Sequence, residues 1–490
     1  MGWVYLINKL KSTLVGILKN LEEIWSWLVN IMVEKMWPAL QSCKHQRYVA
    51  NNILSQLPDD LLFIIMSFLT IKEAARTSVL SHRWNYLWRC FPVLIFEDIS
   101  TMKRMFEDDN SARKERSRSN FLRWVNQIVD AHLGQYIDEL RVTFDLKKRC
   151  QSDVDKWLYF ALAKQVKRLE LDFTPVIHQW KPSLPKLRLS PDQISGFKSC
   201  LRSLSLIHVN VTSKDVDCLL RSCMVLENLC INTSWSLRYI KAVSLPLQLK
   251  HLEVSFCPRL RIIDILAPKL LSFAHHGDPI ELHINNASFL SKLSLGIKHC
   301  TQDILAYAFD SLSKYFPQLV YLSWKMQMYH GGLLISEPYC FEFNLGIKNP
   351  PAMTNLKHLE LHVFALCEQS LLGWADLIEA SPQLEKLTLK FFTFDGMRHR
   401  KIMKHYGLPL KSLKTLELHN DIGLPIDLEF ITYVVENSIV LKDVIVELRP
   451  LLDPLSKYIS VKDQVENLKR IVPKGVRLTI NIVDKWEESL

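Results

Sequence analysis

Residues 356–361 read Leu-Lys-His-Leu-Glu-Leu and residues 413–418 read Leu-Lys-Thr-Leu-Glu-Leu, and the spacing of these leucines returns along most of the chain. With isoleucine, valine or tryptophan accepted at the same positions, eleven segments follow the pattern, most of them about 23 to 37 residues apart. A single match is typical of any buried strand or helical stripe, whereas eleven indicate a repeated structural unit. The segments are Ile137-Leu140-Val142, Val166-Leu169-Leu171, Leu201-Leu204-Leu206, Leu226-Leu229-Ile231, Leu249-Leu252-Val254, Leu290-Leu293-Leu295, Leu319-Leu322-Trp324, Leu356-Leu359-Leu361, Leu384-Leu387-Leu389, Leu413-Leu416-Leu418 and Leu441-Val444-Val446.

The pattern resembles leucine-rich repeats, here over residues 121–379 and continuing through 380–482. Each repeat should contribute one short strand whose leucines enter a continuous core, followed by a helix or an irregular turn on the outer side. We therefore predict an α/β fold with a parallel sheet curved into an arc. Residues between the leucines should face the concave side, because strand side chains alternate. Between Leu270 and Ile284 the pattern is degraded and gives no register.

A second pattern occupies residues 57–89, LPDDLLFIIMSFLTIKEAARTSVLSHRWNYLWR. Pro58 suits the first turn of a helix, and Thr70 with Glu73 three residues on forms a capping box for a second short helix. Ser81 can cap a third helix, which Pro92 ends. Three short helices bury little apolar surface by themselves, so this segment predicts a partner surface.

The same stretch resembles the plant F-box, whose marks are a Leu-Pro opening, the "SFL" turn, "TSVLS-RW" and a closing Leu-Trp. The resemblance places an F-box at residues 52–97 and implies binding to a Skp-type adaptor that bridges to a cullin. The adaptor contacts, or the core beneath them, are then Leu57, Pro58, Leu61, Leu62, Ile65, Phe68, Leu69, Val79, Leu80, Trp84, Leu87 and Trp88.

The C-terminal part, 380–482, resembles the FBD region of plant F-box proteins in LKSLKTLELHNDIGLPIDLEFITYVVENSIVLKDVIVEL (residues 410–448). A strand, a helix and another strand are expected there, and VPKGVRLTINI (residues 472–482) fits a terminal strand. Resemblance to the plant F-box/leucine-rich-repeat/FBD family thus covers residues 52–482.

Two further segments lie outside these patterns. Apolar residues at three- and four-residue steps predict an amphipathic helical extension at residues 1–45, with four tryptophans. Packing against the chain or a partner is favoured for it over contact with a membrane surface. Residues 98–120 are polar and mixed in charge, which predicts a solvated linker.

The composition argues against catalysis and bound cofactors. The 11 cysteines are scattered without a CxxC pair, and the chain lacks GxxxxGK[ST], GxGxxG, GxSxG and HExxH. We expect no cofactor, no metal site, and reduced thiols in the cytoplasm or nucleus. The net charge of +10 permits nucleic-acid binding, but acidic residues are spread along the chain, so none is predicted.

These patterns predict a non-catalytic substrate-recognition subunit of an SCF-type E3 ubiquitin ligase. An adaptor-binding scaffold acting outside a ligase would have the same sequence features. The captured protein is not identified by any motif. Residues flanking the leucines should point away from the core, for example Tyr321, Ser323 and Lys325. For the later strands, the proposed substrate face is His358, Glu360, His362, Lys386, Thr388, Lys390, Glu417 and His419.

Overall fold

The computed structural model describes residues 58–79, 81–176, 183–243, 247–298, 312–327, 350–366, 374–394, 409–421, 428–449 and 461–482. The helix predicted at residues 1–45 lies outside these ranges, as do Leu57 and Leu80. The chain divides into two compact units, residues 1–91 and 92–490. No helix in the described ranges has the length and apolar character needed to cross a membrane.

The described part of the first unit is built from short helices, as the sequence predicts. Thr70 and Glu73 form the expected capping box, and Ser81 caps the last helix by accepting a hydrogen bond from the Trp84 amide. Arg83 Nε donates to Asp59 Oδ1 at 2.8 Å and so joins the last helix to the first. The elements are α4 (Asp59–Ser67), α5 (Ile71–Arg76), the 3-10 helix η2 (Thr77–Val79) and α6 (His82–Arg89).

The second unit contains a sheet of 14 parallel strands within the described ranges. The leucine triplets lie in register across it: Leu140 pairs with Leu169, and Leu169 with Leu204. The order is β1 (Val93–Glu97), β2 (Glu139–Thr143), β3 (Arg168–Asp172), β4 (Ser203–Ile207), β5 (Asn228–Asn232), β7 (His251–Ser255), β9 (Ser272–Gly277), β11 (Lys292–Lys298), β12 (Tyr321–Gln327), β13 (His358–Leu366), β14 (Lys386–Phe394), β15 (Thr415–Asp421), β16 (Asp443–Arg449) and β17 (Arg477–Ile482).

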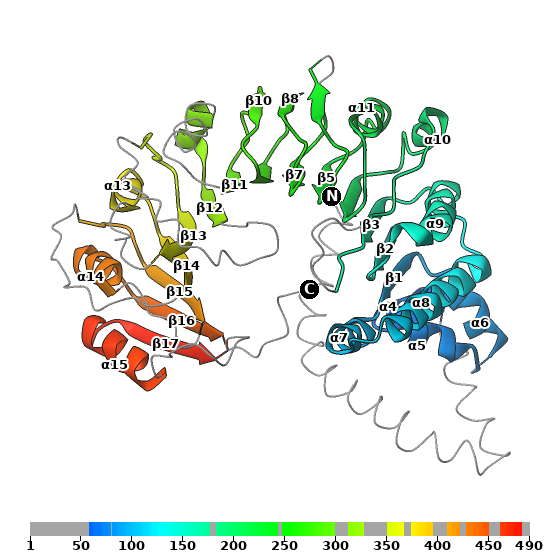
Figure 1. Ribbon diagram of the computed structural model, residues 1–490, viewed down its shortest axis with the longest axis horizontal. Helices are drawn as coiled ribbons and strands as arrows, with labels where there is room; N and C mark the ends of the chain where they lie inside the picture. The colour runs from blue at the N-terminus through cyan, green and yellow to red at the C-terminus, as the bar shows by residue number, and fades with distance from the viewer. Residues whose placement is uncertain are drawn as a thin grey trace, which may run out of the picture. The chain divides into compact units, whose positions relative to one another are not determined.

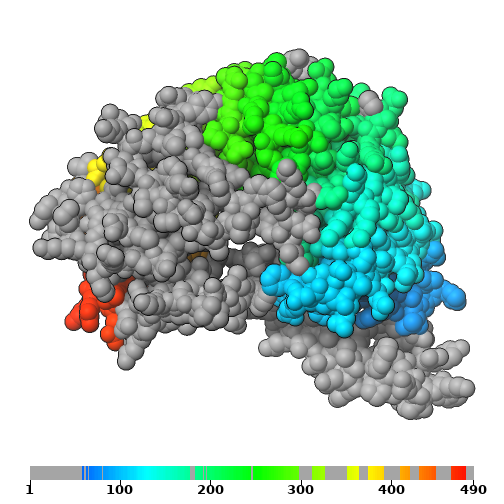
Figure 2. Space-filling model, in the orientation of Figure 1, coloured from blue at the N-terminus to red at the C-terminus, as the bar shows by residue number. Residues whose placement is uncertain are grey.

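Helices cover the outer side of this curved sheet within the second unit (Figure 1). The described residues from β1 to β10, coloured cyan to green, form a continuous body in the space-filling view (Figure 2). The helical segments are α7 (Ile99–Glu107), α8 (Ser111–Ala131), η3 (Lys148–Cys150), α9 (Gln151–Ala163), α10 (Pro191–Ser195), α11 (Ser213–Ser222), η4 (Ser313–Gln318), α13 (Ala375–Glu379), α14 (Leu428–Asn437) and α15 (Val461–Ile471).

The repeats between residues 239 and 285 carry strands in place of outer helices. These strands, β6 (Tyr239–Ala242), β8 (Ile262–Leu266) and β10 (Glu281–Asn285), form a second parallel sheet in the order β10-β8-β6. The repeat whose register the sequence does not give, between Leu270 and Ile284, contains β9. In this strand Phe273 and His275 take the places of leucines and are buried. His275 Nδ1 lies 2.8 Å from the Val254 carbonyl oxygen, which lets a polar ring occupy a leucine position.

The prediction of a solvated linker at residues 98–120 is wrong. Helices α7 and α8 begin there, and α8 continues to Ala131 with Phe121 and Val125 buried. The charged stretch is the start of this helix. Arg118 can be buried there because its charge is paired: its Nη2 donates to Asp145 Oδ2 at 2.7 Å. Strand β1 pairs with β2, so the last residues of the predicted segment 52–97 belong to the sheet.

Candidate functional site

Some of the predicted adaptor-binding residues of the first unit are exposed, and others are buried in its core. Phe68 is 61% exposed and Val79 is 83% exposed, and Pro58 is also exposed. Leu69 is half-buried. The side chains of Leu61 and Ile65 lie outside the described set. Tyr86 is a further exposed aromatic residue that the sequence pattern did not single out. The other predicted residues that the structure describes form the core and are Leu62, Trp84, Leu87 and Trp88.

The predicted substrate face is brought together by strands β13, β14 and β15. Because the strands are parallel and in register, the residues between the leucines form three rows across the sheet. We call them the first, middle and third rows. His358 and Lys386 pair in the first row. In this part of the sheet the middle row contains Glu360, Thr388 and Glu417, and the third row contains His362, Lys390 and His419.

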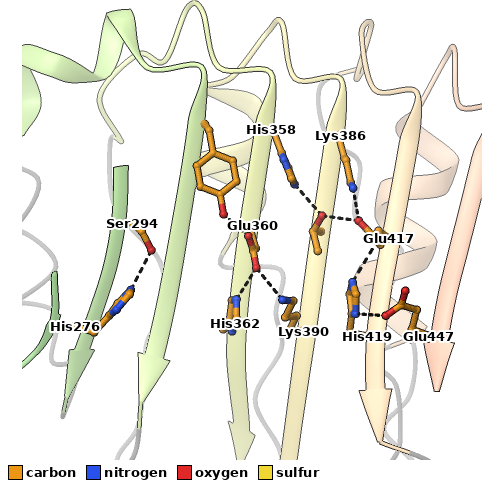
Figure 3. A network of polar contacts seen from close by, with 12 residues as sticks. His276, Ser294, His358, Glu360, His362, Lys386, Lys390, Glu417, His419 and Glu447 are labelled. Atoms are coloured by element: carbon orange, nitrogen blue, oxygen red, sulfur yellow. Dashed lines mark hydrogen bonds and ion pairs between the residues drawn. The ribbon is translucent and has the colours of Figure 1, made fainter. Parts of the chain in front are cut away.

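Glu360 is the centre of one group of polar contacts on this face (Figure 3). Its Oε1 accepts from His362 Nε2 at 2.7 Å and from Lys390 Nζ at 3.1 Å, and its Oε2 accepts from the Tyr321 hydroxyl. Burial by itself would raise the pKa of Glu360. The hydrogen bonds from His362 and Tyr321, together with the Lys390 ammonium, outweigh burial and hold this pKa well below its ordinary value.

Glu417 organises a second group on the next strands. His419 Nε2 lies 3.5 Å from Glu417 Oε1, and Lys386 Nζ lies 2.5 Å from Glu417 Oε2. Thr388 Oγ1 donates to Oε2 at 3.1 Å. The His419 contact and these donors lower the pKa of Glu417 to about 2. His419 Nδ1 is also 2.8 Å from Glu447 Oε2, which extends the group to β16 (Figure 3).

These contacts change what the predicted face offers to a partner. Lys386 and Lys390, two of the cations expected to attract a substrate, already hold carboxylates of the same sheet. Burial lowers the pKa of His358 and of His362, so both rings are neutral near pH 7. The charges at this end of the sheet are therefore largely compensated within the protein.

The middle of the sheet has a different set of side chains. His276 of β9 is buried, with Nε2 3.0 Å from Ser294 Oγ and Nδ1 3.0 Å from Ser255 Oγ. Burial, with the Lys325 ammonium nearby, lowers its pKa to about 3. A Cβ on Gly296 would lie 2.5 Å from His276 Cδ2, so this ring needs a glycine beside it. The sequence reasoning missed His276 because the register of β9 could not be read.

Residues 128–422 match the family model of the At1g61320/AtMIF1 LRR domain, which spans more than half of the chain. Residues 54–96 match the F-box domain and residues 409–446 match the FBD. The chain belongs to the plant F-box/LRR/FBD family.

Several proteins of Arabidopsis thaliana are similar to this chain. The F-box/FBD/LRR-repeat protein At5g53840 is 25% identical over 79% of this chain and 86% of its own length. The putative FBD-associated F-box protein At5g22720 is 25% identical over 81% of this chain and 88% of its own length. The putative F-box/LRR-repeat protein At1g56400 is 30% identical over 38% of this chain, and the match spans 42% of its own length.

In this F-box/LRR/FBD protein the FBD region continues the repeat sheet. Strands β15 and β16 pair in parallel, with α14 between them in sequence, as the strand–helix–strand prediction has it. The Tyr433 hydroxyl of α14 donates to Glu379 Oε1 of α13 at 2.8 Å, which fixes one outer helix to the preceding one. The expected terminal strand is β17, which pairs with β16.

Two of the described cysteines, Cys223 and Cys230, are thiols with a raised pKa. Burial raises the pKa of the Cys223 and Cys230 thiols to about 12, which keeps them protonated. Across the same described ranges, no three histidine, cysteine or acidic side chains are grouped so that they could hold a metal ion.

Proposed function

We propose that this protein is the substrate-recognition subunit of an SCF-type E3 ubiquitin ligase. The F-box unit binds a Skp-type adaptor, and the adaptor joins the protein to a cullin. The concave face of the repeat sheet holds the protein to be ubiquitinated. Ubiquitin transfer is carried out by other subunits, so the chain itself is non-catalytic. The proposed site of action is the cytoplasm, the nucleus or both.

The observation that carries the proposal is the exposure of Phe68 and Val79 on the F-box unit. Large apolar side chains that remain exposed in a unit of short helices are typical of a surface that a partner covers. The neighbouring Trp84, Leu87 and Trp88 are buried and support this surface without being available to a partner. The proposed contacts are therefore Phe68, Val79 and Pro58, while the tryptophans keep the helices folded.

The test is co-purification of the adaptor with the full-length protein and with the double variant Phe68→Glu/Val79→Glu. Each substitution would bury a carboxylate in the interface with the adaptor. The double variant should therefore lower adaptor affinity by at least about thirtyfold, the loss expected for an interface anchor. The matched control is Phe289→Glu/Ile439→Glu, which changes two side chains of the second unit that are each 65% exposed. The control should retain the adaptor, and both variants should keep the thermal stability of the parent protein.

The composition of the purified complex separates a ligase subunit from a scaffold. A cullin that co-purifies with the parent protein and is lost with Phe68→Glu/Val79→Glu is the expected result. An adaptor without any cullin would support the scaffold function instead. Full adaptor binding by the double variant would contradict the proposed F-box surface.

A further inference from the structure

Lys325 on β12 differs from the other lysines of the later concave face. Its side chain is half-buried, and within the described residues it forms no ion pair, whereas Lys386 and Lys390 each hold a carboxylate. Burial lowers the pKa of Lys325 and the Lys390 ammonium lowers it further, while the carboxylates of Glu360 and Glu253 raise it without forming an ion pair with it. A partly desolvated ammonium without a directly paired carboxylate is costly, and proteins normally pair such a charge.

The described neighbours of Lys325 in the third row are uncharged or already paired. Among them, Lys325 is therefore the cation that remains to bind a partner. Lys325 pairs in register with His362, and His362 pairs with Lys390, so the three side chains lie side by side in the third row. The row continues in the other direction through Gly296 to His276, whose ring nitrogens are both engaged by serines. His276 and His362 are neutral near pH 7 and thus form uncharged walls on either side of the Lys325 ammonium.

A second feature beside Lys325 is a buried hydroxyl. Ser323 precedes Lys325 by two residues and faces the same side of the sheet, in the middle row. Its Oγ is fully buried, and the Tyr321 hydroxyl on the same strand is its polar neighbour. Buried hydroxyl groups normally have a partner, so Ser323 is not a donor for a bound protein, and the cation Lys325 is the group that remains for one at this place.

We propose that Lys325 binds an oxyanion carried by the captured protein, either the phosphate of a phosphorylated side chain or a carboxylate. Neighbouring strands are about 4.8 Å apart, which puts the backbones of Lys325 and Lys390 about 10 Å from each other across β13. Two lysine side chains at this separation can approach one oxyanion from both sides. Lys325 supplies the unpaired charge, and Lys390, already held by Glu360, supplies a second positive group. This inference rests on the proposed function, because it describes how that function's substrate is recognised.

The experiment measures binding of fluorescent peptide pools to the full-length protein by anisotropy. The pools have random flanks and a fixed central phosphoserine, aspartate or serine. The parent protein should bind the phosphoserine pool, the aspartate pool or both at least about fivefold more tightly than the serine pool. Comparison of the two charged pools identifies the source of the oxyanion.

Three variants assign this preference to Lys325. Lys325→Gln should abolish it, and Lys325→Arg should retain it, because the charge is kept. Lys386→Gln is the matched control: it removes a lysine of the same face whose charge is already paired, so the preference should remain. Equal binding of all three pools by the parent protein, or an unchanged preference in Lys325→Gln, overturns the inference.

Adaptor co-purification with the same variants keeps this test separate from that of the proposed function. Lys325→Gln should bind the adaptor as the parent protein does, since the F-box unit is unchanged. A preference for charged peptides in a protein that binds no adaptor would refute the ligase function and leave the oxyanion site standing.

Discussion

Glu170 and Glu360 occupy equivalent middle-row positions at opposite ends of the concave face, are each partly buried, and differ in the direction of their pKa shifts. Burial raises the pKa of Glu170, because its ion partner Arg141, with Nε 3.4 Å away, compensates only in part and Asp172 and Glu139 add negative charge. Glu360 is buried more deeply, with 13% of its side chain exposed against 32% for Glu170, but donors on three sides lower its pKa. Burial alone thus does not set the direction of the pKa shift, and the number of hydrogen-bond donors decides it.

The first way to test this comparison is to change the core beneath both carboxylates. Leu169 precedes Glu170 and Leu359 precedes Glu360, and both leucines are buried in the same sheet core. Leu169→Ala and Leu359→Ala should each lower the free energy of unfolding by about 2–5 kcal/mol, measured by urea denaturation with circular dichroism. Similar losses would mean that the two ends of the sheet differ in the polar side chains of the concave face and not in the core. A loss confined to one variant would show that the cores differ as well.

A smaller effect is expected from the later carboxylates. Glu417→Gln should lower the free energy of unfolding by about 1–3 kcal/mol near pH 7, because bonds from Lys386 and Thr388 lose a charged acceptor. The pKa of Glu417 is lowered from 4.5 to about 2 in the folded protein. Its stabilisation is therefore present above pH 4.5 and is lost as the pH falls toward 2.

The measurement compares the thermal midpoints of the parent protein and Glu417→Gln between about pH 7 and pH 3, a range that covers most of this titration. The gap between them should narrow as the pH decreases. A gap of constant size would mean that the carboxylate charge does not contribute, and that the substituted glutamine only disturbs packing.

The smallest effect should come from Glu170→Gln. A carboxylate whose pKa is raised in the folded state prefers to be neutral there, so glutamine should change the free energy of unfolding by at most about 0.5 kcal/mol near pH 7. The pH dependence has the opposite sign. The parent protein should gain stability relative to Glu170→Gln as the pH falls, because Glu170 takes up its proton more readily when folded. A clear destabilisation at pH 7 would mean that Glu170 is held like Glu360.

The sequence predicts the repeat sheet well because its information is local. Leucines three and two residues apart define each strand, and the strands align at those leucines, as Leu387 does with Leu359 and Leu416. The same rule fails at β9, where Phe273 and His275 replace leucines. A polar ring is acceptable there only because the Val254 carbonyl oxygen lies at hydrogen-bond distance from it, and sequence spacing does not reveal such a partner.

The sequence predicts which residues lie on the concave face. It does not predict which of their charges are compensated within the protein. Alternation along each strand identifies Glu360, Lys390 and Lys325 as outward-facing residues. Which lysine keeps its charge for a partner depends on contacts across strands that are about 30 to 40 residues apart in sequence. The segment 98–120 fails for a related reason: its charges read as solvated, whereas Arg118 is buried against Asp145 of a later loop.

The outer strands β6, β8 and β10 have a consequence for how the sheet bends. Packed helices need about 8–10 Å between their axes, but neighbouring strands need only about 4.8 Å. A repeat with an outer helix is therefore a wedge, wider outside than inside, and adds curvature. The repeats whose inner strands begin at Asn228, His251 and Ser272 are followed by the outer strands β6, β8 and β10. They have strands on both sides and are slabs of equal width. Bending is thus concentrated in the helical repeats, and the central repeats provide a flatter floor between them.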